Sequence, residues 1–196
     1  FLVENYLQDA IEYDVDVIRD KYGDCILAIS EHIEHAGVHS GDSGMITPPQ
    51  SLSRELRERM REISKKMAQE LGIIGPLNIQ FAVKNNEVYC IEANPRGSRT
   101  LPYLSKAYNI DMPGLAVAAM CGHPFKNDKI LEEENSLKTY FVKQSTFPFD
   151  RFPSDGIILG PTMLSTGETM GVDSDKNHAI LKSYLGNHPH LSEPGK

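Results

Sequence analysis

The sequence predicts an α+β protein in which an antiparallel sheet is backed by helices. Polar and apolar residues alternate over 13–20, which is the period of a strand with one buried face. Apolar residues recur every three or four positions over 51–71, which is the period of an amphipathic helix. Two further strand-like runs, 78–84 and 87–93, are separated only by two asparagines, which tolerate the positive φ of a tight hairpin turn.

The composition is that of a globular, acidic protein. The 196 residues suffice for one ordinary domain with a core, and 20 basic against 27 acidic residues give a net charge of −7. That balance argues against a nucleic-acid partner, because phosphates require a basic surface. No apolar run approaches the roughly 20 residues of a membrane helix, so we expect no membrane partner. The sequence opens without Met and without the basic region of a signal peptide, and we expect it to be a piece of a longer protein.

The three cysteines, Cys25, Cys90 and Cys121, lie far apart in apolar segments and form no C-x-x-C pair. We expect them to be reduced and buried, as free cysteines usually are, and the protein to be cytoplasmic.

The first strand is expected to pair with a second over 25–30, through a Tyr-Gly-Asp turn at 22–24. Residues 35–49 contain three glycines, two prolines and no periodicity. We predict a loop there, long enough to serve the function of the protein.

The helix over 51–71 has a single apolar stripe and a charged opposite face. Ser51 or Ser53 is expected to cap its start, and Gly72 to end it. The charged face reads as a solvated surface rather than a binding surface. The stripe consists of Leu52, Leu56, Met60, Ile63, Met67 and Leu71.

Weaker patterns beyond residue 100 predict a smaller, mostly helical extension. They indicate, in order, two helical pieces within 100–121 that break near Pro113-Gly114, short strands within 138–147 and 157–172, and a short helix over 176–186. We therefore divide the chain into a main lobe, 1–99, and an extension, 100–196.

The strongest chemical signal is a group of polar residues around the second hairpin. Gln80 lies on its first strand, and Glu92 and Asn94, two residues apart on the second, project to one side. Three oxygen-donating side chains suit a hard cation such as Mg²⁺, and the guanidinium groups of Arg96 and Arg99 beside it would suit phosphoryl transfer. For hairpins in general, a solvent-facing polar surface would be the simpler explanation.

Strict alternation also predicts the two faces of this hairpin. In the first strand Ile79, Phe81 and Val83 point one way, and Asn78, Gln80 and Ala82 the other. In the second strand Val88, Cys90, Glu92 and Asn94 share a face opposite Tyr89, Ile91 and Ala93.

The string IEANPRGSRTLPYLSKA resembles the signature of the ATP-grasp superfamily, and within it the large chain of carbamoyl phosphate synthetase. Four further strings resemble that family in the same order: FLVENYLQDAIEYDVDVIRD, EHIEHAGVHSGDS, NIQFAVKNNEVYCIEANPR and STGETMGV. The resemblance runs from residue 1 to about residue 186 and implies the C-terminal lobe of an ATP-grasp fold.

The large chain of this family has two ATP-grasp halves, which phosphorylate bicarbonate and carbamate respectively. HSGDS and RTLPYLSKA are more similar to the second half. The resemblance therefore implies ATP- and Mg²⁺- or Mn²⁺-dependent phosphorylation of carbamate, in a protein of arginine or pyrimidine biosynthesis. The alternatives are the bicarbonate half, another ATP-grasp ligase such as a biotin carboxylase or a peptide-forming ligase, and a non-catalytic domain kept for folding or subunit contact.

The resemblance also implies roles for individual residues. Gln80, Glu92 and Asn94 match metal ligands, the first two also belonging to the nucleotide site, and Arg96 and Arg99 match catalytic residues that hold the phosphoryl group and the carbamate. The remaining nucleotide-binding positions are Asn5 and Leu7 beside the adenine, Glu12 on the ribose, and Gly37, Val38, His39 and Ser40 in a loop that closes over the nucleotide.

The implied partners are a small glutaminase subunit and the remaining lobes of the large chain. Because the glycine-rich loop that covers the phosphates in this family would lie upstream of residue 1, we expect the isolated chain to be inactive.

Overall fold

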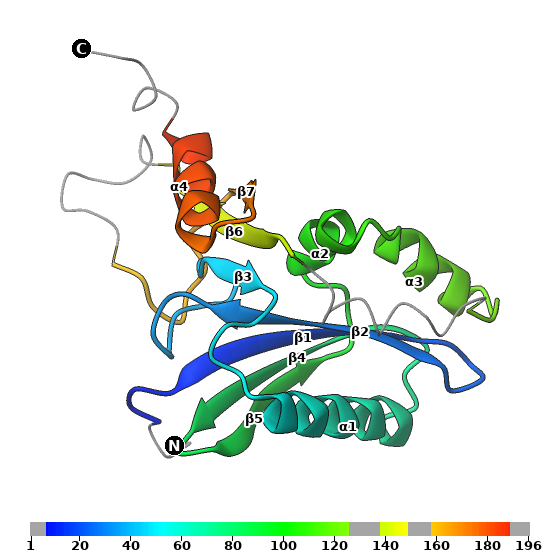
Figure 1. Ribbon diagram of the computed structural model, residues 1–196. Coiled ribbons are helices and arrows are strands. Elements are labelled where there is room, and N and C mark those ends of the chain that lie inside the picture. Colours follow the sequence, from blue (N-terminus) through cyan, green and yellow to red (C-terminus); the bar gives the residue numbers. More distant parts are fainter. Residues whose placement is uncertain (1–6, 126–137, 149–157, 189–196) are drawn as a thin grey trace, which may run out of the picture.

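The computed structural model describes residues 7–125, 138–148 and 158–188. It is built on a seven-stranded antiparallel sheet with the order β5-β4-β1-β2-β3-β6-β7 (Figure 1). The strands are β1 (Ile11–Arg19), β2 (Cys25–His32), β3 (Met45–Thr47), β4 (Gly75–Lys84), β5 (Glu87–Asn94), β6 (Tyr140–Thr146) and β7 (Gly167–Asp173). The helices are α1 (Arg54–Glu70), α2 (Thr100–Tyr108), α3 (Met112–Met120) and α4 (Lys176–Asn187). The α+β prediction is confirmed.

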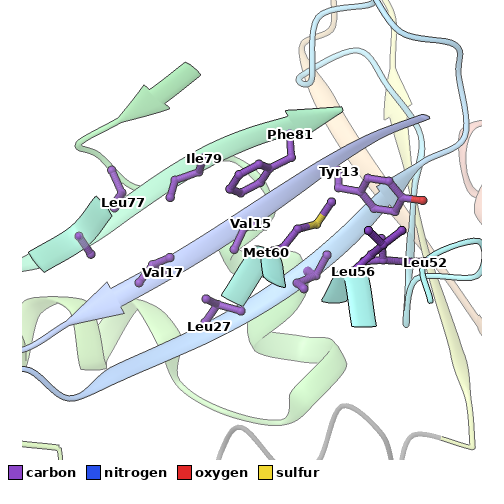
Figure 2. Packing of buried hydrophobic residues seen from close by; sticks show 12 residues of the cluster. Tyr13, Val15, Val17, Leu27, Leu52, Leu56, Met60, Leu77, Ile79 and Phe81 are labelled. Carbon is purple, nitrogen blue, oxygen red and sulfur yellow. The ribbon is translucent and has the colours of Figure 1, made fainter. Parts of the chain in front are cut away.

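Helix α1 covers one face of the sheet, and α2 and α3 cover the other (Figure 1). The alternation in β1 explains this division. Val15 and Val17 point into the core beneath α1, where they meet Met60 and Phe81 (Figure 2). Asp14 and Asp16, one position out of phase, therefore point to the α2 face. Three successive alternate residues of β1, Glu12, Asp14 and Asp16, thus bring carboxylates to that face, and the next one, Ile18, packs in the apolar cluster of α2 and α3.

The ends of α1 follow the sequence closely. Ser53, rather than Ser51, caps the helix, and its Oγ accepts a hydrogen bond from the Leu56 amide at 3.2 Å. Ser51 instead shares a 2.8 Å hydrogen bond with the Tyr13 hydroxyl. Gly72 follows the helix with a φ of 64°, a left-handed conformation that glycine adopts without a steric penalty.

The hairpin of β4 and β5 turns at Asn85 and Asn86, whose φ values of 52° and 65° confirm the predicted tight turn. A β-bulge interrupts the pairing, because Gln80 pairs with Glu92 whereas Phe81 pairs with Cys90. Ile91 is the extra residue. The prediction that Val88, Cys90, Glu92 and Asn94 share one face is therefore wrong: Val88 packs against the α1 core, and Glu92 and Asn94 point to the opposite face with Gln80.

The two helical pieces within 100–121 are confirmed, but they do not break at Pro113-Gly114. The break is at Asn109, which has a φ of 52°. Pro113 instead lies in the first turn of α3, where its missing N–H leaves no helical hydrogen bond unmade. Asp111 caps this helix by accepting a 3.0 Å hydrogen bond from the Gly114 amide.

The predicted 35–49 loop contains the short strand β3, which joins β2 to β6. Strand β6 and helix α4 form close to their predicted positions, whereas β7 starts only at Gly167 within the predicted 157–172 segment. The division at residue 99 stays a prediction. Among the described residues, strands from both sides of it belong to one sheet.

The prediction of buried cysteines is wrong, since Cys90 and Cys121 are exposed and Cys25 is only half-buried. Cys90 lies on β5, the edge strand next to solvent, and Cys121 follows the end of α3. Over residues 7–125, 138–148 and 158–188, each helix is too short or too polar to cross a membrane.

Candidate functional site

A hollow of about 450 Å³ opens on the face of the sheet that carries α2. Six separate stretches of the chain contribute to its wall, although they lie up to 149 residues apart, from Asp14 to Met163. The lining residues are Asp14 and Asn78 from the sheet, His39, Ser40 and Gly41 from the loop after β2, Arg96 to Thr100, and Lys143 and Met163.

A buried ion cluster lies beneath this hollow. His32, on β2, places Nε2 3.2 Å from Asp14 Oδ1 and Nδ1 3.5 Å from Glu12 Oε2. Burial by itself would lower the pKa of His32, but the hydrogen bonds and charges of Asp14 and Glu12 outweigh it and raise that pKa to about 9. His32 is therefore a cation at neutral pH, held between two carboxylates.

A second buried carboxylate anchors the segment that carries the arginines. Asp16 accepts a hydrogen bond from the Thr100 hydroxyl, at the start of α2, and a 3.2 Å hydrogen bond from Asn78 Nδ2. Burial, together with the charge of Asp14, raises the pKa of Asp16 to about 6. The N-P-R-G-S-R segment is thus tied to the centre of the sheet at its C-terminal end.

The loop after β2 is fixed at several points. The Gly37 amide donates to Glu12 Oε1 at 3.2 Å, which links this loop to β1. Asp42, completely buried, accepts hydrogen bonds from the amides of Leu164 and Ser165, both at 2.8 Å. The segment before β7 is therefore hydrogen-bonded to the loop after β2 and fixes its position.

The two arginines differ in their surroundings. Arg96 is exposed, and among the described residues its side chain makes a 3.4 Å hydrogen bond to the neighbouring Gly97 carbonyl. Arg99 is half-buried: its Nη1 donates to Ser165 Oγ at 3.0 Å, and its Nε lies 3.4 Å from Glu168 Oε1. Arg99 is thus held in position, whereas Arg96 is free to meet a ligand.

The proposed metal ligands form part of two rows across the sheet. Directly paired residues share a face, so Asp14, Gln80 and Glu92 form one row over β1, β4 and β5. Asp16, Asn78 and Asn94 form the next. Gln80, Glu92 and Asn94 do not line the hollow themselves, but Gln80 pairs with Asp14 and Asn94 pairs with Asn78, both of which do.

This donor set fits Mg²⁺ or Mn²⁺. One carboxylate and two amide oxygens are the hard oxygen ligands that these ions prefer, with phosphate and water completing the shell. Asn94 Nδ2 donates to Glu92 Oε1 at 2.8 Å, so the two side chains already lie together. Among the described residues, no group of three or more His, Cys, Asp or Glu side chains could hold a metal ion. The proposed set differs from such a group, because it combines one carboxylate with two amides.

Comparison with known proteins identifies the family. Residues 1–127 match the model of the carbamoyl-phosphate synthase L chain, ATP binding domain. The chain belongs to this family. It is 42% identical to the carbamoyl phosphate synthase large chain of Myxococcus xanthus and 46% identical to that of Methanobrevibacter smithii, in both cases over the whole chain. It spans 18% of the length of each of these relatives.

Two solved structures support the ATP-grasp fold. A biotin carboxylase from Campylobacter jejuni superimposes with a TM-score of 0.68 over 91% of this chain and 45% of its own, at 18% identity. An ADP complex of N5-carboxyaminoimidazole ribonucleotide synthetase gives a TM-score of 0.69 over 97% of this chain and 52% of its own, at 20% identity. These likenesses concern the fold alone.

The structure brings most of the predicted site residues of this synthase family member together. Arg96, Arg99, His39 and Ser40 line the hollow, and Glu12 contacts Gly37. Val38 and Leu7 are half-buried outside its lining, and Asn5 lies outside the described residues.

Sequence reasoning missed Asp14, His32 and Lys143 as parts of this site. Asp14 had a detectable signal, because an acidic residue at every second position of an otherwise apolar strand predicts a buried carboxylate. Lys143 had none, since its approach to the hollow depends on the pairing of β6 with β3, nearly 100 residues away in sequence.

Proposed function

We propose that this chain is part of a carbamoyl phosphate synthase large chain and phosphorylates carbamate with ATP. The observation that carries the proposal is the arrangement of two arginines at a hollow directly beside three oxygen donors on the same face of the sheet. Such a site would hold an anionic acceptor next to metal-bound phosphates.

In this proposal a carbamate oxygen attacks the γ-phosphorus of ATP, the bond between the γ-phosphorus and the β–γ bridging oxygen breaks, and ADP leaves. Arg96, exposed at the hollow, neutralises charge on the transferred group. Arg99, fixed by Ser165 and Glu168, orients the acceptor. Glu12 holds the ribose, and its contact with Gly37 links ribose binding to the loop over the nucleotide.

Gln80, Glu92 and Asn94 would hold Mg²⁺ or Mn²⁺, which when bound neutralises charge on the β- and γ-phosphates. The bulge at Ile91 is essential to this assignment, because it turns Glu92 and Asn94 onto the Gln80 face.

The proposal includes two partners in the cytoplasm: the remaining lobes of the large chain and a small glutaminase subunit that supplies ammonia. The second candidate is the bicarbonate-phosphorylating half, since planar acids of similar size suit the same pocket. HSGDS and RTLPYLSKA favour the carbamate half. A purely structural role is a third alternative. The buried charged groups beneath the hollow argue against it, because burying charges is costly and a domain with only a structural role would not need them.

Two partial reactions of the full-length protein separate these functions. Without ammonia, phosphorylation of bicarbonate gives a mixed anhydride that water hydrolyses, and the result is bicarbonate-dependent ATP hydrolysis. The reverse of carbamate phosphorylation makes ATP from ADP and carbamoyl phosphate. We expect Arg96→Met to reduce the second reaction by about 10²-fold and leave the first nearly intact.

Arg59→Met is the matched control, because Arg59 is an exposed arginine of α1 on the opposite face of the sheet. It is expected to change neither reaction. Loss of the bicarbonate-dependent reaction alone in Arg96→Met would assign the chain to the bicarbonate half, and no loss of either would favour a structural domain.

A further inference from the structure

Lys143 is a buried cation that the proposed mechanism does not yet use. It lies on β6, is 1% exposed, and lines the same hollow as Arg96 and Arg99. A buried ammonium group is unfavourable unless other groups compensate its charge. Its presence at the hollow therefore requires an explanation.

Within the described part of the chain, the compensation of Lys143 is incomplete. Its Nζ donates to the Ser40 carbonyl at 3.3 Å and lies 3.9 Å from Glu168 Oε1. The same carboxylate oxygen is 3.4 Å from Arg99 Nε, so two cations share one anion. Burial lowers the pKa of Lys143, the charges of Glu168, Asp14 and Glu34 oppose this effect, and the charge of Arg99 adds to it. Among the described residues only Glu168 pairs with Lys143 Nζ within 4 Å, and Glu168 also pairs with Arg99, so an anion entering the hollow would still find an incompletely paired ammonium group.

The position of Lys143 indicates which anion this is. The metal ligands lie on β4 and β5 at one edge of the sheet, whereas Lys143 comes from β6, beyond β1, β2 and β3. Arg99 lies between the two groups, because it contacts Glu168 next to Lys143 and belongs to the short segment that joins the end of β5 to α2. The nucleotide phosphates belong at the metal ligands, which leaves the far side of the hollow for the acceptor.

We propose that Lys143, together with Arg99, binds the planar oxyanion of the acid that accepts the phosphoryl group. The inference rests on the proposed function for the identity of the reaction, but it concerns a separate subsite with its own ligand. Its ligand class is the small carboxylate-type anion, a chemistry that carbamate and bicarbonate share. The Arg96→Met partial reactions described above identify which of the two acids it is.

A purely structural role would also account for a buried lysine, since Lys143 connects β6 to the loop at Ser40. Three variants separate the two roles. Lys143→Gln keeps a hydrogen-bond donor without the charge, Lys143→Met removes both, and Lys143→Arg keeps the charge. Lys182→Met is the control for net charge, because Lys182 is exposed on α4 and paired with Asp173.

The probe is formate, a small planar carboxylate, titrated into the ¹⁵N-labelled 196-residue chain at constant ionic strength with chloride. The resonances of Arg99 and of residues 37–43 report binding. We expect Lys143→Met and Lys143→Gln to weaken formate binding at least about tenfold, equivalent to about 1.4 kcal/mol, and Lys143→Arg to stay within about threefold of the original. Lys182→Met is expected to bind formate as the unchanged chain does.

Several results would overturn the proposal. One is an unchanged formate affinity in Lys143→Met, and another is a loss of affinity in Lys182→Met as large as that in Lys143→Met. A third is the absence of any response of the unchanged chain to formate at about 100 mM. The fourth is binding of inorganic phosphate that depends on Lys143, without binding of formate. The assay involves neither ATP nor metal, so it tests the anion subsite separately from the proposed function. If Glu92→Gln kept full catalytic activity, the metal-site assignment would fail, but formate binding that depends on Lys143 would still support the subsite.

Discussion

Replacing His32 by glutamine removes the cation that Asp14 and Glu12 enclose. The pKa of His32 is about 9 in the folded chain against an ordinary value of 6.5, so the folded state binds the proton more tightly than the unfolded state does. Each pKa unit corresponds to about 1.4 kcal/mol, and the protonated side chain therefore stabilises the fold by roughly 3 kcal/mol. This contribution is fully present below pH 6.5 and is lost as the pH rises through about 9.

The assay is the free energy of unfolding from urea titrations between pH 6 and pH 10. His32→Gln is expected to be less stable than the unchanged chain by roughly 3 kcal/mol at pH 6, and the difference should shrink toward pH 10. Taking the difference between the two proteins removes contributions from other titrating groups, such as Asp16, that both share.

His35→Gln is the matched control, because His35 is exposed in the loop after β2. Its pH profile is expected to follow that of the unchanged chain. A constant difference between His32→Gln and the unchanged chain across the pH range would show that His32 is not held as a cation, and the description of the buried ion cluster would be wrong.

Three further predictions concern the core, the packing of α4 and the isolated chain. Leu56→Ala should lower the free energy of unfolding by about 2–5 kcal/mol, because Leu56 is buried in the core. Leu71→Ala, at a half-exposed position, should lower it by less than about 1 kcal/mol. Equal losses in the two variants would show that Leu56 does not face the core. Gly171→Ala should lower the free energy of unfolding by about 1–3 kcal/mol, because the added Cβ would overlap the Ala179 carbonyl oxygen. Gly167→Ala is the control, because its added Cβ would have its nearest contact at 3.6 Å. An unchanged stability of Gly171→Ala would contradict the close approach of α4 to β7. Calorimetry of the 196-residue chain should show ATP binding no tighter than about millimolar, because the carboxylate of the proposed metal site is exposed to water; sub-micromolar binding would contradict this.

The local features of the fold were predictable from the sequence because they depend on neighbouring residues. The period of α1, its serine cap and its terminal glycine all lie within one segment, as does the Asn-Asn turn between β4 and β5. The alternation of β1 likewise predicts which side chains enter the α1 core. These patterns need no information about distant parts of the chain.

The features that were predicted wrongly depend on tertiary pairing. Strict alternation would have sent Glu92 toward the α1 core, and only the bulge at Ile91 brings it to the Gln80 face. Nothing in the local sequence specifies a bulge at that position. Cys90 is exposed for a similar reason, since its strand lies at the edge of the sheet and receives no partner on its outer side among the described residues.

The candidate site shows the same limit. The arginines and the three oxygen donors lie in a short stretch of sequence and were found there. Lys143 reaches the hollow, and Glu168 reaches Arg99 and Lys143, only because β6 and β7 extend the sheet past β3. The pairing of β3 with β6 links segments about 100 residues apart. The ion cluster beneath the hollow combines His32 with acids from β1, so its charge state follows from the folded arrangement alone.

The central claim is that Glu92 is a ligand in a working ATP site, and the rate of carbamoyl phosphate formation by the full-length protein tests it most directly. Glu92→Gln keeps the size of the side chain and removes its charge, and we expect the rate to fall by at least about 10²-fold. Glu87→Gln, an exposed glutamate at the other end of the same strand, should leave the rate unchanged. A near-normal rate in Glu92→Gln would contradict the assignment of the metal ligands and, with it, the proposed mechanism.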